Sequence, residues 1–408
     1  MNKPFQINPG VLAPATVNAI KEVLIDFHTH ETPWIPCGLS TRINWGPTVQ
    51  SPSKFISSSN LTRIIDHSID DLTITVEAGL KLTELQALLA KHHQWLSVDW
   101  PWGSEPSSNP SSAGTIGGLV ARGLSGGLRQ RHMAMKDQII GIGIIRSDGV
   151  SAHAGGRVVK NVAGYDLMRL LCGSWGSLAL INELTLRTQP IRPARARLDI
   201  EGDLISLEGF RRDLLRTNLT PEYCDWIGST PQGWELQIGL ASVNEKAVKD
   251  QLASLQNLAN QHKVSIRQEL WRGPLIEEKA LSISLDKNNW LSRMSLPPSN
   301  IHSLLSSQEL QDLAQWEIRI GAGLGVGDCW QSISNPETDP SPAEQVKCLR
   351  QKVQDLGGQL TLLNQPKETA KKLPSWLDSP SKPIIEAVKY QFDPKGQLSI
   401  GRLPGVAG

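Results

Sequence analysis

Apolar side chains recur along the first 190 residues with two different spacings. Between residues 16 and 30 they fall three or four positions apart, at Val17, Ile20, Leu24 and Phe27, which predicts a helix with one buried face. Alternation of β-branched and polar side chains predicts strands instead. On these two patterns we expect a second helix at 82–92, strands at 72–78, 138–146 and 178–188, and a hairpin turn at 147–149.

The pattern changes after Pro190 and Pro193. Strand-like stretches such as ARARLDIEG then alternate with helix-like ones such as EKAVKDQLASLQNLANQHK, which predicts an antiparallel sheet backed by helices. The stretch 100–112, rich in Pro and Ser, predicts a functional loop, whereas 331–342 and 364–382 predict mobile loops. We therefore expect a domain boundary near residue 192.

The stretch Asp26-Phe27-His28-Thr29-His30 contains the HxH metal pair that opens amidohydrolase barrels. In a strand His28 and His30 would share a face, but in a helix they lie about 200° apart and cannot share a metal ion. Because the apolar spacing predicts a helix here, we interpret both histidines as solvated residues at a helix end, and we expect no metal site.

Composition narrows the possible classes of protein. A chain of 408 residues exceeds the usual size of one domain and predicts two or three. Its 41 basic and 40 acidic residues leave a net charge of +1 with no long basic block, which argues against nucleic-acid binding. No stretch reaches the ~18 apolar residues of a transmembrane segment, so we expect a cytoplasmic protein. The five cysteines form no CxxC, so any electron carrier in this chain should be an organic cofactor.

Glycines cluster at four places in the first 190 residues: 36–41, 113–118, 123–127 and 173–177. Glycine allows positive φ and lets backbone N–H groups approach a diphosphate, while Thr and Ser hydroxyls add neutral donors. Each cluster could also be a tight turn and nothing more. Their occurrence together favours a dinucleotide site.

Two common nucleotide motifs do not account for this pattern. The chain contains no GxxxxGK[ST], and the run 321–327 resembles a Rossmann fingerprint but has Val326 where the third glycine belongs and no helix start after it. We interpret 321–327 as a turn of the second domain that lines the substrate side.

A family resemblance refines this interpretation. The runs TIGGLVARGLSGG, KDQIIGIGIIRSDG, AGGRVVKNVAGYDLMRLLCGSWGSLALINELTLRTQP and FDPKGQLSIGRLPG resemble the E subunit of bacterial glycolate oxidase, of the vanillyl-alcohol oxidase / p-cresol methylhydroxylase type of FAD-binding proteins. The resemblance implies an α+β fold: a two-lobed FAD-binding domain at 1–192, an antiparallel-sheet-plus-helix cap domain at 193–382, and a C-terminal segment, 383–408, that returns to the FAD-binding domain.

The resemblance also implies which residues hold FAD. The loop Pro36, Cys37, Gly38, Leu39, Ser40 and Thr41 would wrap the diphosphate, and Thr115, Ile116, Gly117 and Gly118 would approach the flavin end. The other expected cofactor-binding residues are Ser125, Gly126, Asp137, Ile139, Gly155, Gly156, Lys160 and Ile181. Leu39, Ser40, Met133 and Ala179 stand where relatives carry glycine, and Ser399 stands where they carry asparagine. No histidine motif for a covalent flavin is present, so we expect non-covalent FAD.

The implied function is an FAD-dependent oxidoreductase, a subunit of a glycolate (2-hydroxy acid) oxidase or dehydrogenase. Its partners would be a sister FAD subunit and an iron–sulfur subunit, with peripheral attachment to the membrane through that complex as an option. The alternative is a non-catalytic electron-relay or assembly subunit on the same fold. Such chemistry needs a base and a cationic clamp for the carboxylate. Arg293, Arg319 and Arg402 are candidate clamps and His132 and His153 candidate bases, but no catalytic residue is assigned.

Replacing Gly117 or Gly118 by valine should abolish FAD retention, because the added side chain would occupy the approach to the phosphates and remove backbone hydrogen bonds of ~1 kcal/mol each. Flavin stoichiometry of the purified, folded variants measures this effect. Unchanged stoichiometry would remove the assignment of this loop.

Overall fold

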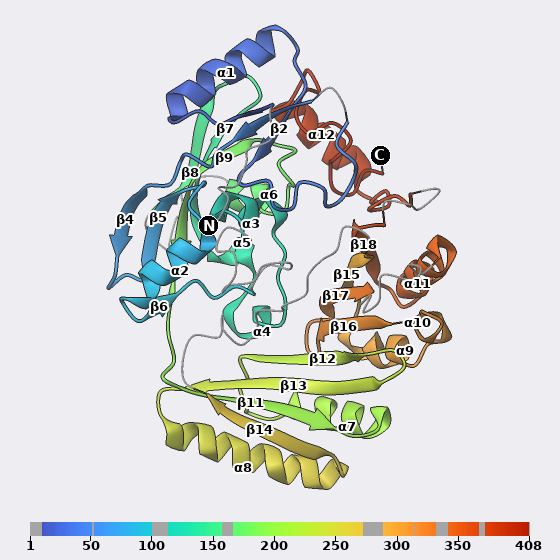
Figure 1. Cartoon of the computed structure of the whole chain (residues 1–408). Helices are drawn as coiled ribbons and strands as arrows, with labels where there is room; N and C mark the ends of the chain where they lie inside the picture. The colour runs from blue at the N-terminus through green and yellow to red at the C-terminus, as the bar shows by residue number, and fades with distance from the viewer. Residues whose placement is uncertain are drawn as a thin grey trace, which may run out of the picture.

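The computed structural model describes residues 10–50, 53–99, 113–156, 166–271, 289–313, 315–331, 342–366 and 372–407. The expected loop at 100–112, the expected cofactor residue Lys160 and most of the expected loop at 331–342 lie outside these residues. Figure 1 shows an upper lobe built from the N-terminal half, a lower lobe built around a broad sheet, and a C-terminal helix, α12, that lies against the upper lobe.

The upper lobe is built on a five-stranded antiparallel sheet with the order β4-β5-β9-β7-β8. Its strands β5, β7 and β9 are largely buried and share one hydrophobic core with helices α2 and α3. The elements of this part are β4 (Ile64–Ser68), β5 (Thr73–Glu77), α2 (Leu82–Ala90), α3 (Ile116–Arg122), α4 (Arg129–His132), α5 (Met135–Gln138), β7 (Ile139–Ile145), β8 (Ser151–Gly155), α6 (Leu167–Leu171) and β9 (Leu180–Arg187).

A small parallel sheet and one helix complete this lobe. The sheet has the order β1-β3-β2, with β1 (Val11–Leu12), β2 (Trp34–Cys37) and β3 (Lys54–Ser57). Helix α1 (Val17–Thr29) begins at Thr16, whose hydroxyl accepts a hydrogen bond from the Ala19 N–H, and it buries Ile20, Leu24 and Phe27. The predicted helix is confirmed. His28 lies within this helix and His30 is its C-cap, so the two histidines are not on one face of a strand, as the HxH metal pair would need.

The lower lobe is an eight-stranded antiparallel sheet with the order β14-β11-β13-β12-β16-β17-β15-β18. Alternate side chains such as Leu198, Trp226 and Ile318 enter a core shared with helices on one face of the sheet. The elements are β11 (Ala194–Glu201), α7 (Leu204–Leu214), β12 (Tyr223–Ser229), β13 (Gly233–Ser242), α8 (Glu245–His262), β14 (Ser265–Trp271), β15 (Leu291–Ser295), η1 (Pro298–Asn300), α9 (Ile301–Leu305), α10 (Gln308–Gln311), β16 (Trp316–Gly321), β17 (Val326–Gln331), α11 (Ala343–Asp355) and β18 (Gln359–Asn364).

The short strands β6 (Gln94–Trp95) and β10 (Gln189–Pro190) pair antiparallel where the two lobes are joined.

The described part of the expected loop at 364–382 is packed against the rest of the protein. Trp376 is 7% exposed, and its indole N–H donates to the carbonyl of Val406 at 2.8 Å. A tryptophan buried in this way explains why a stretch rich in Pro, Ser and Lys still has a defined place.

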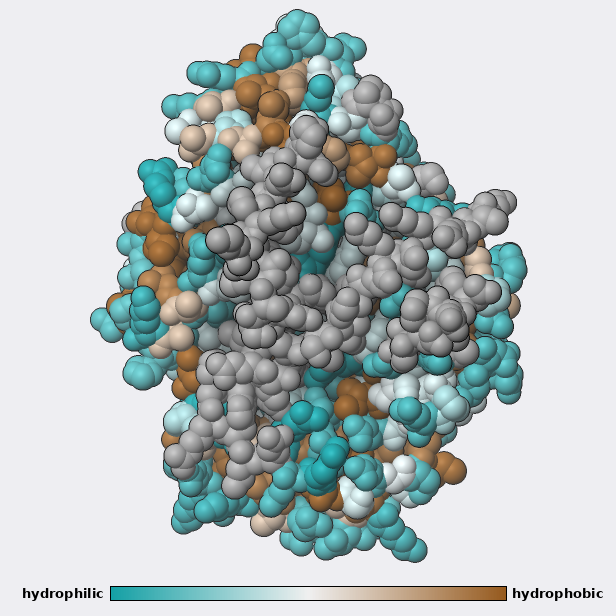
Figure 2. All heavy atoms as spheres, in the orientation of Figure 1, coloured by the Kyte–Doolittle hydropathy of each residue, from teal (hydrophilic) through white to brown (hydrophobic). Residues whose placement is uncertain are grey.

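Exposed apolar side chains lie along the edge strand β4, at Ile64, Ile65 and Ile69, which are 40–44% exposed. Figure 2 shows apolar surface at the corresponding left side of the molecule. The remaining coloured surface of that face is mainly hydrophilic. None of the helices in the described part of the chain combines the length and the apolar character that a membrane span requires.

The C-terminal segment is attached to the upper lobe by strand-like and buried polar contacts. Leu398 forms a parallel bridge with Trp34, whose N–H donates to the carbonyl of Gln397 at 2.9 Å. In helix α12 (Lys382–Phe392), the Lys389 ammonium donates to Asp393 at 2.6 Å and to the carbonyls of Ser177 and Leu398 at 2.8 and 2.7 Å. Burial lowers the pKa of Lys389, and the Asp393 carboxylate opposes that shift.

Lys389→Met should lower the free energy of unfolding by about 3–5 kcal/mol, because it leaves the buried Asp393 carboxylate without its cation. Urea denaturation followed by circular dichroism measures the change. Lys382→Met is the matched control on the same helix, since Lys382 pairs with Asp378 at the surface. A loss of equal size in both variants would contradict the proposed anchoring role of Lys389.

Candidate functional site

Two adjoining cavities share Arg42 and Arg122 in their walls. We call the first the loop cavity. Its other lining residues belong to the upper lobe and the C-terminal segment: 36–41, Ile43, Ser58, Gly114, Thr115, Gly117, Gly118, Ala121, 175–176, 179–181 and Arg402. We call the second the interlobe cavity, because residues of both lobes line it. The upper lobe contributes Trp45, Asp99, Leu119 and 124–127, and the lower lobe contributes Asp225, Arg293, Arg319, Gly321, Val326, Gly327 and Asp328.

The loop cavity exists because two loops from distant parts of the sequence approach closely. A Cβ at Gly38 would overlap the side chain of Thr115. Thr115 caps helix α3, where its hydroxyl accepts from the Gly118 N–H at 3.2 Å, and the Gly38 carbonyl accepts from the Ser57 hydroxyl at 2.8 Å. Both loops are therefore fixed at their bases.

The loop 36–41 offers hydrogen-bond donors to this cavity. Ser40 has a φ of 56°, and among the described residues the backbone N–H groups of Leu39, Ser40 and Thr41 have no acceptor. Several adjacent N–H donors on a glycine-containing loop can bind phosphate oxygens. The loop thus has the donor set that the diphosphate of a dinucleotide requires.

The two glycines of helix α3 differ in what surrounds them. A Cβ at Gly117 would lie 2.8 Å from the Cβ of Ala78, and the Gly117 N–H already donates to the Ala78 carbonyl at 2.8 Å. A Cβ at Gly118 would meet only the Thr115 hydroxyl, at 3.3 Å. Gly117 is therefore required by the packing of α3 on the sheet, whereas Gly118 leaves open space at the cavity.

The predicted cofactor residues fall into three groups. Those that line the loop cavity are Pro36, Cys37, Gly38, Leu39, Ser40, Thr41, Thr115, Gly117, Gly118 and Ile181, and Ser125 and Gly126 line the interlobe cavity. Ile116 and Ile139 are buried in the hydrophobic core of the upper lobe, and Asp137 accepts from the Ala134 N–H at the start of α5. Gly155 and Gly156 lie at the end of the edge strand β8, with neither in the wall of these cavities.

The positions that depart from the family pattern are placed differently from one another. Leu39 and Ala179 line the loop cavity. Met133 is 45% exposed, with a φ of 66°, and lies in the wall of neither cavity. Ser399 donates from its hydroxyl to the carbonyl of Gly176 at 2.9 Å, which ties the C-terminal segment to the cavity wall. Among these positions, Leu39, Ser40 and Ala179 line the loop cavity and add side-chain bulk where a ligand would lie.

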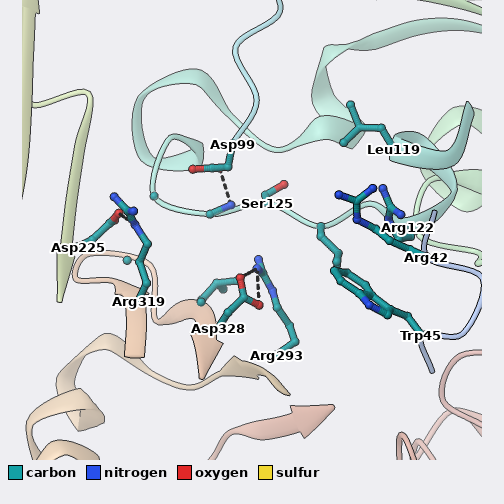
Figure 3. A pocket seen from close by; sticks show the side chains of 16 residues that line it. Arg42, Trp45, Asp99, Leu119, Arg122, Ser125, Asp225, Arg293, Arg319 and Asp328 are labelled. Atoms are coloured by element: carbon teal, nitrogen blue, oxygen red, sulfur yellow. Dashed lines mark hydrogen bonds and ion pairs between the residues drawn. The ribbon is translucent and has the colours of Figure 1, made fainter. Parts of the chain in front are cut away.

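The candidate clamps of the lower lobe are already paired within the protein (Figure 3). The Arg293 guanidinium donates to both carboxylate oxygens of Asp328 at 3.1 and 3.0 Å, and Arg319 contacts Asp225 at 3.1 Å. These two pairs bring no net charge to the interlobe cavity. The run at 321–327, interpreted from the sequence as a turn on the substrate side, does join β16 to β17 and lines this cavity through Gly321, Val326 and Gly327.

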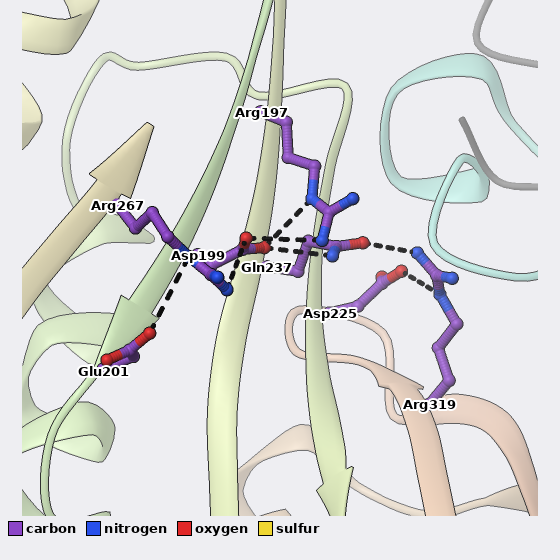
Figure 4. Close-up of polar contacts among 7 residues, drawn as sticks. All are labelled: Arg197, Asp199, Glu201, Asp225, Gln237, Arg267 and Arg319. Carbon is purple, nitrogen blue, oxygen red and sulfur yellow. Dashed lines mark hydrogen bonds and ion pairs between the residues drawn. The ribbon is translucent and has the colours of Figure 1, made fainter. Parts of the chain in front are cut away.

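A chain of polar contacts holds Arg319 from the other side (Figure 4). Its second guanidinium nitrogen donates to Gln237 at 2.7 Å, and Gln237 donates to Asp199 at 3.1 Å. Asp199 in turn pairs with Arg197 and Arg267, both at 3.1 Å. These residues lie on the face of the lower sheet that is opposite the helices. Side chains alternate along each strand, so burying one set in the core of the lower lobe places the charged set beside the cavity.

The other candidate residues have structural contacts. Arg402 donates to the carbonyls of Trp45 and Pro47 at 2.8 and 2.7 Å, and burial lowers its pKa to about 10. His132 contacts Glu222 at 3.3 Å and the Trp95 ring, and His153 is exposed on β8. Neither histidine lines the two cavities, so no histidine base is provided by the described residues of this site.

Sequence reasoning missed Arg42, Arg122, Trp45 and Asp99. Both guanidinium carbons lie over the Trp45 ring, at 5.6 Å for Arg42 and 5.7 Å for Arg122. Asp99 accepts from the Gly126 N–H at 2.6 Å and so fixes the loop 123–127. The available signal was that Arg42 directly follows the predicted phosphate loop and Arg122 directly precedes a glycine cluster.

Burial and, to a smaller extent, the positive charge of Arg122 together lower the pKa of Arg42 to about 8. Burial also lowers the pKa of Arg122 to about 10. Two cations taken out of water side by side destabilise each other unless an anion lies nearby. The wall that the two cavities share therefore carries two neighbouring cationic groups.

Comparison with known proteins agrees with this geometry. Residues 9–155 match the family described as FAD binding domain. Among solved structures, chitooligosaccharide oxidase has a TM-score of 0.68 at 14% identity and covers 97% of this chain and 91% of its own. An alkyldihydroxyacetonephosphate synthase has a TM-score of 0.70 at 13% identity, over 96% and 77% of the two chains. The fold is thus the two-lobed FAD-binding fold of the p-cresol methylhydroxylase type, as the sequence predicted.

Curated relatives match a shorter part of the chain. Glycolate oxidase subunit GlcE of Escherichia coli (strain K12) is 35% identical over 39% of this chain and 42% of its own length. Glycolate oxidase subunit GlcD of Bacillus subtilis (strain 168) is 30% identical over 44% and 37%. A mitochondrial D-lactate dehydrogenase [cytochrome] of Arabidopsis thaliana is 28% identical over 47% and 32%. The matches thus span about a third to two fifths of the length of these relatives.

Residues 9–155 match the FAD binding domain family, and over part of its length the chain is homologous to glycolate oxidase subunits and D-lactate dehydrogenases. The site fits this cofactor, because the backbone N–H groups of 39–41 have no acceptor among the described residues and could bind a diphosphate, and the loop cavity is open at Gly118. FAD binding, as predicted, is the property that the family defines.

Gly118→Val should yield a folded protein that loses FAD, because the valine side chain enters the loop cavity and not the core. Gly117→Val should instead lower the melting temperature, because its side chain overlaps Ala78. Flavin absorbance per protein and thermal denaturation distinguish the two effects. The assignment of the loop cavity is contradicted if folded Gly118→Val retains a full complement of FAD.

Proposed function

We propose that this chain is an FAD-dependent oxidoreductase subunit that acts on a small 2-hydroxy acid such as glycolate. The observation that carries the proposal is that Arg42 and Arg122 line both cavities, so the loop cavity adjoins the cavity that the lower lobe lines. A cofactor on the phosphate loop would lie beside the polar face of the lower lobe. The residues of the loop cavity would hold FAD non-covalently, and FAD would supply the hydride-accepting chemistry.

The chain's own residues would bind the acid and keep water out of the site. Leu119 and Leu124 give the interlobe cavity apolar walls, and Trp45 closes it beside the two arginines. The Arg293–Asp328 and Arg319–Asp225 pairs provide fixed polar groups from the lower lobe. In this proposal the cofactor-binding domain spans 1–192, the cap 193–382, and the segment 383–408 closes the cofactor side.

The names of the relatives support a place in a complex. Two of them are subunits of glycolate oxidase. We propose a cytoplasmic assembly with a sister FAD subunit and an iron–sulfur subunit that receives the electrons, and with attachment to a membrane only through the complex.

A second candidate function is a non-catalytic electron-relay or assembly subunit on the same fold. It is favoured by the internal pairing of Arg293 and Arg319 and by the lack of a histidine in the described walls of the interlobe cavity. In that case the sister subunit would oxidise the acid.

Anaerobic addition of glycolate to the FAD-loaded chain separates the two functions. If the chain is catalytic, the flavin band at ~450 nm should disappear, because hydride transfer reduces the cofactor. Acetate, which lacks the hydroxyl group, is the matched control ligand and should leave the band unchanged. A chain loaded with FAD whose band survives glycolate, D-lactate and other 2-hydroxy acids would have the relay or assembly function instead.

A further inference from the structure

We propose that Arg122 and Arg42, stacked on the Trp45 ring, form the carboxylate receptor of this protein, on the cofactor-binding lobe and not on the cap. The choice of a small acid as ligand rests on the proposed function. The assignment of the receptor rests on the charges and contacts of these three residues.

The receptor is built from two connected parts of the upper lobe. Arg42 follows the phosphate loop, and its guanidinium donates to the Thr41 hydroxyl at 3.0 Å. Arg122 is in the last turn of α3, just before Gly123 ends that helix. Figure 3 shows both guanidinium groups close together beside the indole of Trp45. Stacking on an aromatic face holds a guanidinium in a fixed plane, which suits the planar fork that binds a carboxylate.

The charges of the interlobe cavity are unevenly distributed. On the cap side each arginine has its own aspartate, at 3.0 Å for Arg293 and 3.1 Å for Arg319. On the other side, the Asp99 carboxylate accepts from the N–H groups of Gly126 and Leu128, and Arg122 has no carboxylate partner among the described residues. To pair with a cap arginine, an incoming anion would have to displace Asp328 or Asp225. It could pair with Arg122 without displacing a carboxylate of the described residues. The lowered pKa values of both upper-lobe arginines report the same electrostatic cost, which a bound anion would relieve.

Two oxyanions could occupy such a receptor: the carboxylate of an acid or a phosphate of the cofactor. The phosphate loop has its own donors, the N–H groups of Leu39, Ser40 and Thr41, which supply a diphosphate site without the arginines. Arg42 and Arg122 also line the interlobe cavity, together with the ion pairs of the cap. The two arginines are therefore available to bind the acid in that cavity. These observations favour the carboxylate.

The test measures binding of oxalate, a two-carbon acid without an α-hydrogen to transfer, to the FAD-loaded chain by isothermal titration calorimetry. Arg122→Gln should weaken oxalate binding by about 10- to 100-fold, as expected for a lost charge-assisted hydrogen bond. Arg122→Lys should lie between this variant and the wild type, because it keeps the charge and loses the fork. FAD content should stay the same in all three.

Two further variants serve as comparisons. Arg216→Gln removes an exposed arginine of the cap and should leave oxalate affinity unchanged. The double variant Arg293→Gln/Asp328→Asn removes an ion pair without net charge from the cavity wall and should weaken oxalate binding less than Arg122→Gln does. Circular dichroism confirms that each variant is folded before binding is measured.

Two results would overturn the inference. Loss of FAD from Arg122→Gln, with oxalate affinity unchanged in the molecules that keep FAD, would assign the arginines to the cofactor phosphate. A large loss of oxalate affinity in the Arg293/Asp328 variant, with none in Arg122→Gln, would assign the carboxylate to the cap. Oxalate binding that depends on Arg122, in a chain whose flavin glycolate does not reduce, would support the receptor and contradict the catalytic function.

Discussion

The site depends on the close approach of two loops that lie almost 80 residues apart in the sequence. Gly38 touches the Thr115 side chain with no room for a Cβ, and Thr115 at the same time caps helix α3. Any side chain at position 38 would move the phosphate loop away from the helix that forms the other wall. The geometry of the cofactor lobe therefore depends on a steric constraint at one residue, and the donor groups of 39–41 are useful only because that constraint is met.

The lower lobe contributes through the regular alternation of its strands. Burying Leu198, Trp226 and Ile318 against helices turns Asp199, Asp225 and Arg319 toward the upper lobe. Each of these groups is paired with a group of opposite charge, so the lower lobe presents ion pairs without net charge to the cavity. On the upper lobe, the guanidinium groups of Arg42 and Arg122 lie over the Trp45 ring, and Arg122 has no carboxylate partner among the described residues. The proposed cofactor donors and the proposed anion receptor therefore lie on the same lobe.

The sequence predicted those parts of the molecule that local patterns determine. Helix α1, strands β5, β7 and β9 and the alternating strand β11 follow directly from apolar spacing, and the glycine clusters at 36–41 and 113–118 do meet at one cavity. Strands β15 and β17 were missed because polar residues such as Arg293 and Asp328 interrupt their apolar pattern, and that pair forms only across the folded sheet. Arg122 was missed for a similar reason: its proximity to Arg42 comes from packing, and no spacing in the sequence encodes it.

The attachment of residues 389–402 to the upper lobe has a consequence for biosynthesis. Arg402 holds the carbonyls of Trp45 and Pro47, and Ser399 holds that of Gly176, so the cofactor lobe is completed by residues made some 200 to 350 positions after its own strands. While the ribosome is still translating the cap, the upper lobe lacks these ties. Incorporation of the flavin is thus expected to follow synthesis of this distal segment, and a prematurely terminated chain would emerge as a colourless apoprotein.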